Sequence, residues 1–163
     1  MVDAIIEWAK DLPAPLAVVV VAMVPIIELR GAIPLGHFLD LGGVPSYWWA
    51  VLGNLLPVPF ILWLLPPTAA WAERHWAWLH RVIERLSSYT ERRHTKRFER
   101  LRDLALITFV AIPLPVTGAW SGSLAAYVFG VRRGRALGLI TVGVLIAGIV
   151  VSAFIGALGM TID

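Results

Sequence analysis

The stretch VPIIELRGAIPLG (residues 24–36) interrupts an otherwise apolar segment with two prolines, two glycines and two charged residues. A second stretch, IPLPVTGAWSG (residues 112–122), interrupts another apolar segment with prolines, glycines and hydroxyl side chains. A broken helix is tolerated in a membrane only where protein or a water-filled cavity satisfies the freed backbone groups. Two such breaks in corresponding halves of one chain indicate a transport site near the middle of the membrane.

The composition is that of an all-α integral membrane protein. The 163 residues are 58% hydrophobic and 15% charged, with a mean hydropathy of +0.76, whereas a soluble domain carries about 25% charged residues. The segments without Asp, Glu, Lys or Arg are 12–27, 44–72, 104–131 and 136–162. Three of them exceed the ~20 residues that a spanning helix needs. We therefore expect a multi-pass protein of the plasma or inner membrane.

The distribution of charge predicts the topology of the second half. Residues 73–103 hold 14 of the 25 charged residues, nine of them basic, and Arg132, Arg133 and Arg135 form a second basic cluster. Basic residues favour the cytoplasmic side, yet these two clusters flank the uncharged residues 104–131. A re-entrant hairpin with its tip at the prolines would leave both clusters on one side. A single kinked spanning helix is the alternative.

In the first half, too, residues of one charge flank an apolar segment on both sides, but here they are acidic. Acidic residues surround residues 12–39, which predicts a second hairpin that enters from the outside. Residues 47–66 then cross inward, with tryptophans near both ends as interfacial anchors, and residues 137–158 cross outward. Small residues recur along this last segment and suit close helix packing, including packing between copies of the chain.

These segments make an inverted repeat of a re-entrant helical hairpin plus a transmembrane helix, within a single membrane domain (1–163). The first repeat is 1–72, with a hairpin at about 12–42 and a span at about 47–66; the second is 104–163, with a hairpin at about 104–131 and a span at about 137–158. An offset of 87 pairs Gly31 with Gly118 and Asn54 with Thr141. Opposed repeats are common in transporters. So small a unit predicts a homodimer or a larger homo-oligomer.

Residues 73–103 form the connection between the repeats. Apolar residues at helical spacing predict a cytoplasmic amphipathic helical linker whose basic face meets anionic membrane lipids, at about 1 kcal/mol per charge. A solvated loop that only sets the topology is the alternative. We expect no nucleic-acid partner.

The first break carries the only two charged residues of segment 12–39, Glu28 and Arg30. Ionisable side chains inside a membrane indicate function by default. Arg30 is a candidate anion ligand, and Glu28 is a candidate proton-coupling site. The alternatives are that the two charges neutralise each other or cap helix ends, or that the tip of the hairpin is shallow and both charges are hydrated.

The second break offers glycine backbone and hydroxyl groups to a ligand, although Ser and Thr can instead bond to their own helix carbonyls. Asn54, in the middle of the first span, is a candidate ligand or an interhelical hydrogen-bond partner. The candidate substrate- or ion-binding residues are therefore Glu28, Arg30, Gly31, Pro34, Asn54, Pro113, Pro115, Thr117, Gly118, Trp120 and Ser121.

We expect no metal, no cofactor and no enzymatic activity. The chain has no cysteine, and the histidines of the linker (His75, His80 and His94) lack the i, i+4 spacing of metal ligands. No nucleophile–base or nucleotide-binding motif is present.

The segments ELRGAIPLG (28–36) and PLPVTGAWSG (113–122) resemble the signature segments of the small multidrug export protein family, a distant relative of the DedA/VTT-type membrane proteins. The resemblance implies paired re-entrant hairpins and transport of lipid phosphates such as undecaprenyl phosphate. DedA-like proteins often carry arginines in the second hairpin, and residues 113–122 contain none.

Three functions remain in competition. The first is a transporter or flippase for an anionic amphiphile such as a lipid-linked (polyprenyl) phosphate. The second is a proton-coupled exporter of small cationic drugs. The third is a membrane scaffold that transports nothing.

Overall fold

The computed structural model describes residues 12–75, 96–114 and 117–158, and it is helical without strands in these ranges. The elements are α2 (Ala14–Met23), α3 (Glu28–Phe38), α4 (Gly43–Leu55), α5 (Pro57–His75), α7 (Lys96–Ala111), α8 (Ala119–Val128) and α9 (Arg133–Ala157).

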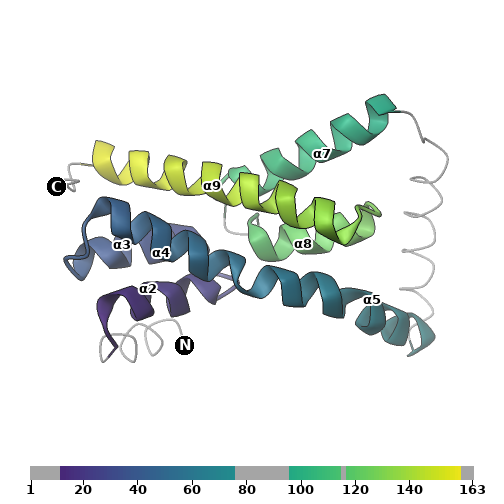
Figure 1. Cartoon of the computed structure of the whole chain (residues 1–163), viewed down its shortest axis with the longest axis horizontal. Coiled ribbons are helices and arrows are strands. Elements are labelled where there is room, and N and C mark those ends of the chain that lie inside the picture. The colour runs from purple at the N-terminus through teal and green to yellow at the C-terminus, as the bar shows by residue number, and fades with distance from the viewer. Residues whose placement is uncertain (1–11, 76–95, 115–116, 159–163) are drawn as a thin grey trace.

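Two long apolar helical segments form the axis of the molecule (Figure 1). The first joins α4 to α5, because Leu56 between them keeps helical dihedral angles (φ −52°, ψ −46°). Its apolar part is Gly43–Trp71, and the second segment is α9, Arg133–Ala157. Both are long and apolar enough to cross a membrane. In the figure the two segments run in opposite directions and pack against each other through α4 and α9.

Each long segment is preceded by a pair of short helices with a break between them. In the first pair, α2 ends at Met23, and the next residue, Val24, is extended (φ −74°, ψ 125°). Pro25 follows it, and a proline disfavours helical angles in the residue before it. The second pair, α7 and α8, is separated by residues 112–118, where Pro113 follows Ile112. In both pairs the chain turns back, and the two short helices contact each other.

The two halves correspond at an offset of 90 residues. Helix α3 ends at Phe38 and α8 at Val128, while α4 begins at Gly43 and α9 at Arg133. The turns also agree, because Asp40 (φ 55°) and Gly130 (φ 61°) both adopt the left-handed conformation of a Schellman cap.

The offset of 87 that the sequence suggested is therefore wrong for these elements. It matched glycines by identity, pairing Gly43 with Gly130, whereas the structure pairs Gly130 with Asp40. The error has a physical cause: aspartate tolerates the left-handed conformation better than most residues, so a glycine in one half can correspond to an aspartate in the other.

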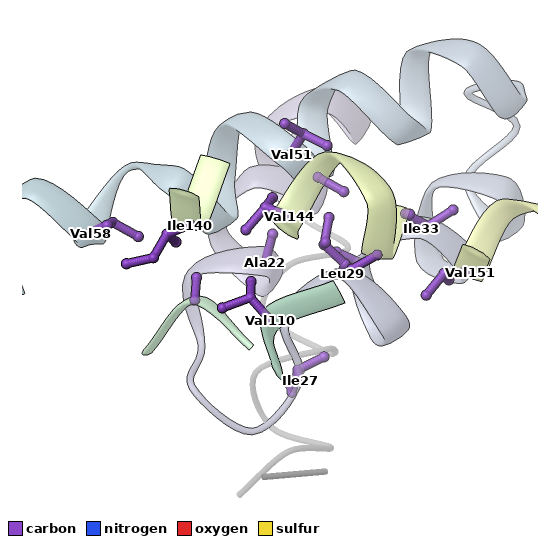
Figure 2. Packing of buried hydrophobic residues seen from close by; sticks show 14 of the residues in the cluster. Ala22, Ile27, Leu29, Ile33, Val51, Val58, Val110, Ile140, Val144 and Val151 are labelled. Carbon is purple, nitrogen blue, oxygen red and sulfur yellow. The ribbon is translucent and has the colours of Figure 1, made fainter. Parts of the chain in front are cut away.

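The core lies where the short helices pack on the long ones (Figure 2). Helix α2 packs on α4 and α7 packs on α9. Gly53 and Gly143, again 90 residues apart, allow this contact: a Cβ on Gly53 would meet α2 backbone, and one on Gly143 would lie 2.6 Å from Val110 Cβ. The same close approach therefore recurs in both halves.

Two of the small residues of α9, Gly143 and Gly148, pack against other helices of the same chain. Gly143 faces α7, and a Cβ on Gly148 would lie 2.6 Å from the Tyr47 ring of α4. The expectation that these glycines serve packing between copies is wrong, because helices of the same chain already occupy that face. The predicted homo-oligomer would need another surface.

The linker is described only at its ends. Helix α5 extends to His75 and α7 begins at Lys96, so the amphipathic pattern predicted within 76–95 lies outside the described residues. Helix α7 continues without interruption across residues 103–104, where the sequence placed the boundary between linker and second repeat.

Candidate functional site

The two breaks meet in the interior of the molecule, and Glu28 makes the contact between them. Its carboxylate accepts hydrogen bonds from the backbone N–H groups of Ala119 and Trp120, the latter at 3.5 Å. The first N–H groups of a helix have no partner within the helix, and no side chain of α8 itself caps them. Glu28 therefore caps α8 from the other half of the chain, where a negative charge also suits the helix dipole.

Glu28 reaches this position through an unfavourable backbone conformation. Its φ of 47° lies in the left-handed region, which costs a non-glycine residue about 1–2 kcal/mol. Such conformations persist where surrounding contacts determine them, and they cluster at functional sites. Here the cap on α8 is the compensating contact.

Gly118 provides the space for the carboxylate. It is buried, and a Cβ at this position would overlap the Glu28 carboxyl group. Glycine is thus required for steric reasons at the point where the second break approaches the first.

Asn54 completes the polar contact from α4. It is 1% exposed and its side chain hydrogen bonds to Glu28, while its Oδ1 lacks a protein partner. Asn54 lines a cavity of about 20 Å³ together with Glu28, Arg30, Pro113, Thr117 and Gly118. That volume can hold one water-sized group, which would satisfy the buried amide oxygen.

Arg30 connects this cavity to a larger apolar groove. Its guanidinium donates a hydrogen bond to the Ile26 carbonyl, and it lies near enough to Glu28 for the two charges to attract. It also lines a groove of about 550 Å³ between α3 and α9. The other residues of this groove are apolar: Pro34, Phe38, Pro113, Val150, Val151, Phe154, Ile155 and Leu158.

The hydroxyl groups of the second break bond locally. Thr117 Oγ1 donates to the Ile112 carbonyl and accepts from the Leu114 N–H at 3.1 Å, while Ser121 Oγ lies 3.4 Å from the Gly118 carbonyl. These contacts match the alternative that Ser and Thr bond to their own backbone. Trp120 instead reaches across, donating from Nε1 to the Met23 carbonyl at 3.1 Å.

The remaining candidates are placed as follows. Pro34 lies in the groove, and Pro113 lines both the groove and the small cavity. Gly31 lies within α3, where a Cβ would meet the Ile27 side chain. Pro115 lies outside the described residues.

Sequence reasoning missed the apolar wall of the site. Leu29, Val110, Ala119, Val144 and Ala147 line the small cavity. An offset of 90 would have singled out Val144 as the counterpart of Asn54. The described residues contain no group of three His, Cys, Asp or Glu side chains that could hold a metal ion.

Comparison with known proteins places the chain in a family. The profile described as "Putative small multi-drug export protein" matches residues 28–150, well over half of the chain, from the start of α3 through the second break and most of α9. No curated protein and no solved structure gives a significant match. The chain belongs to the small multi-drug export protein family.

Proposed function

We propose that the protein is a small membrane transporter or flippase that moves an anionic amphiphile, such as a lipid-linked phosphate. One observation carries the proposal: Arg30 lines both the polar cavity at the two breaks and the apolar groove between α3 and α9. A cation at the edge of an apolar groove suits a ligand with a negative head and an apolar chain. The name of the family, which refers to export, supports transport in general.

The chemistry of the lining residues favours a phosphate-like head. A guanidinium group can donate two parallel hydrogen bonds to two oxygens of one phosphate group. A lysine ammonium acts as a point charge and does not make this bidentate contact. Among the residues that line the groove, Arg30 supplies the charge. The apolar chain would lie along Val150, Val151 and Phe154, while the head would meet Arg30 at the break.

We also propose how the molecule sits in the membrane. Helix pairs α2/α3 and α7/α8 are re-entrant hairpins that enter from opposite faces, and α4–α5 and α9 cross the plasma membrane. Exposed aromatic side chains outside the groove support this arrangement, since Phe60 is 71% exposed and Trp63 68% exposed in the single chain. In this proposal the protein acts as a homo-oligomer and catalyses no covalent chemistry. Kinship with DedA proteins would fit the same arrangement.

The proposal is tested by flux measured with purified protein in liposomes. A fluorescent polyprenyl phosphate is added to one leaflet, and its transfer is followed for the wild type, Arg30→Ala, Arg30→Lys and the matched control Arg133→Ala. Arg30→Ala should lose flux, Arg30→Lys should recover part of it, and Arg133→Ala should transport normally because its exposed side chain lies outside the groove. Full flux in well-folded Arg30→Ala protein would overturn the anion site.

A second candidate is proton-coupled export of cationic drugs. The Glu28 carboxylate supports it, because it lies in the small cavity beside Asn54 and could exchange a proton for a cation. The nearby Arg30 opposes cation binding. Ethidium efflux driven by a pH gradient, present in the wild type and absent in Glu28→Gln, would favour this function over the first. A lack of both fluxes would favour a scaffold.

A further inference from the structure

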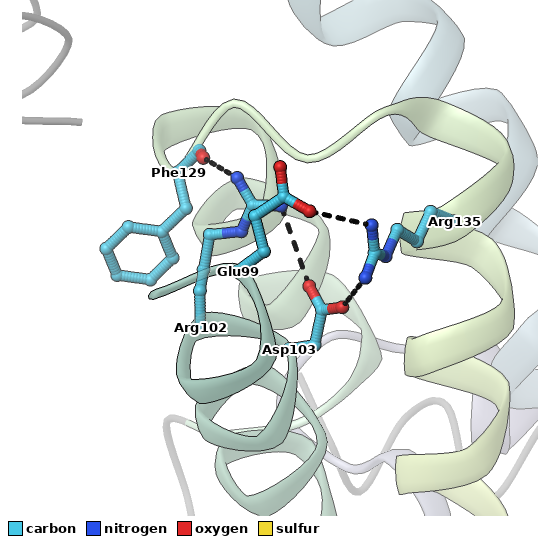
Figure 3. Close-up of polar contacts among 5 residues, drawn as sticks. All are labelled: Glu99, Arg102, Asp103, Phe129 and Arg135. Carbon is cyan, nitrogen blue, oxygen red and sulfur yellow. Dashed lines mark hydrogen bonds and ion pairs between the residues drawn. The ribbon is translucent and has the colours of Figure 1, made fainter. Parts of the chain in front are cut away.

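A network of charged side chains joins α7 to the start of α9, at the end of the molecule where α5 also terminates (Figures 1 and 3). Arg135 of α9 lies 2.5 Å from Asp103 and 3.5 Å from Glu99, both of α7. Asp103 also lies 3.6 Å from Arg102, whose Nη1 donates to the Phe129 carbonyl at 3.2 Å. The buried Asp103 therefore contacts two guanidinium groups, one from each helix.

These side chains border a polar hollow of about 670 Å³ lined by Glu99, Arg102, Gly130, Arg132, Gly134 and Arg135. Three arginines and Glu99 line the hollow, and Asp103 contacts two of those arginines, so the network holds three positive charges and two negative ones. The Arg102 side chain is only 14% exposed, and its Nε atom is buried without a protein partner. The excess of positive charge over the two carboxylates favours an anion in the hollow.

We infer that this hollow binds a phosphate-type anion, either the headgroup of an anionic lipid or free phosphate. A guanidinium group that is oriented by a carboxylate can donate two hydrogen bonds to two oxygen atoms of a phosphate group. The hollow lies where apolar helices give way to charged residues, which is the depth of lipid headgroups. Glu99 lines the same hollow and would repel the ligand, so binding should be moderate in strength.

This site is independent of the transport site proposed above. The groove beside Arg30 involves α9 from Val150 onward, whereas the hollow involves Arg135. At 1.5 Å per residue these positions are about 22 Å apart along the helix axis. A negative result in the phosphate-binding test would therefore not bear on the transport site, and a negative result in the flux test would not bear on the hollow.

The test compares two adjacent arginines. Arg132 lines the hollow, whereas Arg133, also exposed, does not. The full chain is placed in phosphatidylcholine nanodiscs, and binding of inorganic phosphate and of a short-chain phosphatidic acid is measured by calorimetry. Arg132→Ala should weaken binding about tenfold through the loss of one charge-assisted hydrogen bond, while Arg133→Ala should stay near the wild type.

A second variant is expected to strengthen binding, which misfolding would not do. Glu99→Gln removes the repelling carboxylate, so it should tighten binding severalfold. Binding of both probes, or of the phosphatidic acid alone, supports the site; the second result identifies a lipid headgroup as the ligand. Equal losses in Arg132→Ala and Arg133→Ala would show mere surface attraction, and an absence of binding in the wild type would also overturn the inference.

Discussion

The carboxylate of Glu28 lies against Gly118, so closely that a Cβ at residue 118 would overlap it. The two residues are 90 positions apart, and each stands at the start of a helix that follows a break. The contact joins the two halves of the chain, because the same carboxylate caps α8 through Ala119 and Trp120.

Gly118→Ala should destabilise the protein by about 1–3 kcal/mol, the usual cost of overpacking, because the methyl group displaces Glu28 from its cap. Thermal unfolding in nanodiscs measures the effect. Gly138→Ala is the matched control, since that helical glycine faces open space. In a Glu28→Ala background, Gly118→Ala should destabilise the protein less than it does in the wild type. If the loss of stability is the same in both backgrounds, the added methyl group does not clash with Glu28.

Asn54 and Glu28 should be energetically coupled. Asn54→Ala removes a buried donor to the carboxylate, and we expect a loss of about 1–3 kcal/mol of unfolding free energy. A double-mutant cycle with Glu28→Gln should give a coupling energy above about 0.5 kcal/mol. The pair Asn54 and Thr68 is the control, because Thr68 is exposed and bonds to its own helix; a similar coupling for both pairs would contradict the contact.

Filling the groove should block transport without unfolding the protein. Val150→Trp places an indole among the apolar lining residues, so polyprenyl phosphate flux should fall at least severalfold. Val142→Trp is the control, because Val142 is similarly exposed on α9 (43% against 44%) but does not line the groove. Normal flux in Val150→Trp protein would exclude the groove as the path of the apolar chain.

Asp103→Asn should cost about 1.5–3 kcal/mol, the range for hydrogen bonds to charged groups, because it leaves Arg102 and Arg135 without their shared carboxylate. Glu99→Gln breaks only a half-exposed ion pair (side chains 46% and 43% exposed), so it should cost less than about 1 kcal/mol. Chemical or thermal unfolding compares them. Equal costs would mean that Asp103 does not organise the network.

The proposed topology is checked by single-cysteine labelling, which the absence of native cysteine makes direct. Cysteines at Lys96 and Arg133 should react with a membrane-impermeant reagent from one side, and a cysteine at Asp40 from the other. If Lys96 and Arg133 react from opposite sides, α7 and α8 together cross the membrane, and the re-entrant hairpin is excluded.

Much of the fold follows from local patterns in the sequence. The apolar segments 44–72 and 136–162 predicted the two long helices, because length and hydropathy are local properties. Pro25 and Pro113 lie at the two breaks, since proline restricts its own backbone and that of the preceding residue. The other residues of the predicted first break, Gly31, Pro34 and Gly36, lie inside the continuous helix α3, so that part of the prediction was wrong. Glu28 and Arg30 stood out as candidates because charge within an apolar segment is costly.

Tertiary structure alone decided how these pieces meet. No local pattern indicates that Glu28 caps the other half of the chain, that Arg30 borders a groove formed with α9, or that Gly148 packs on Tyr47 of its own chain. Each of these depends on contacts between residues distant in sequence. The physical reason is that burial and capping are set by what neighbouring helices present, whereas helix formation and helix breaking are set within a few residues.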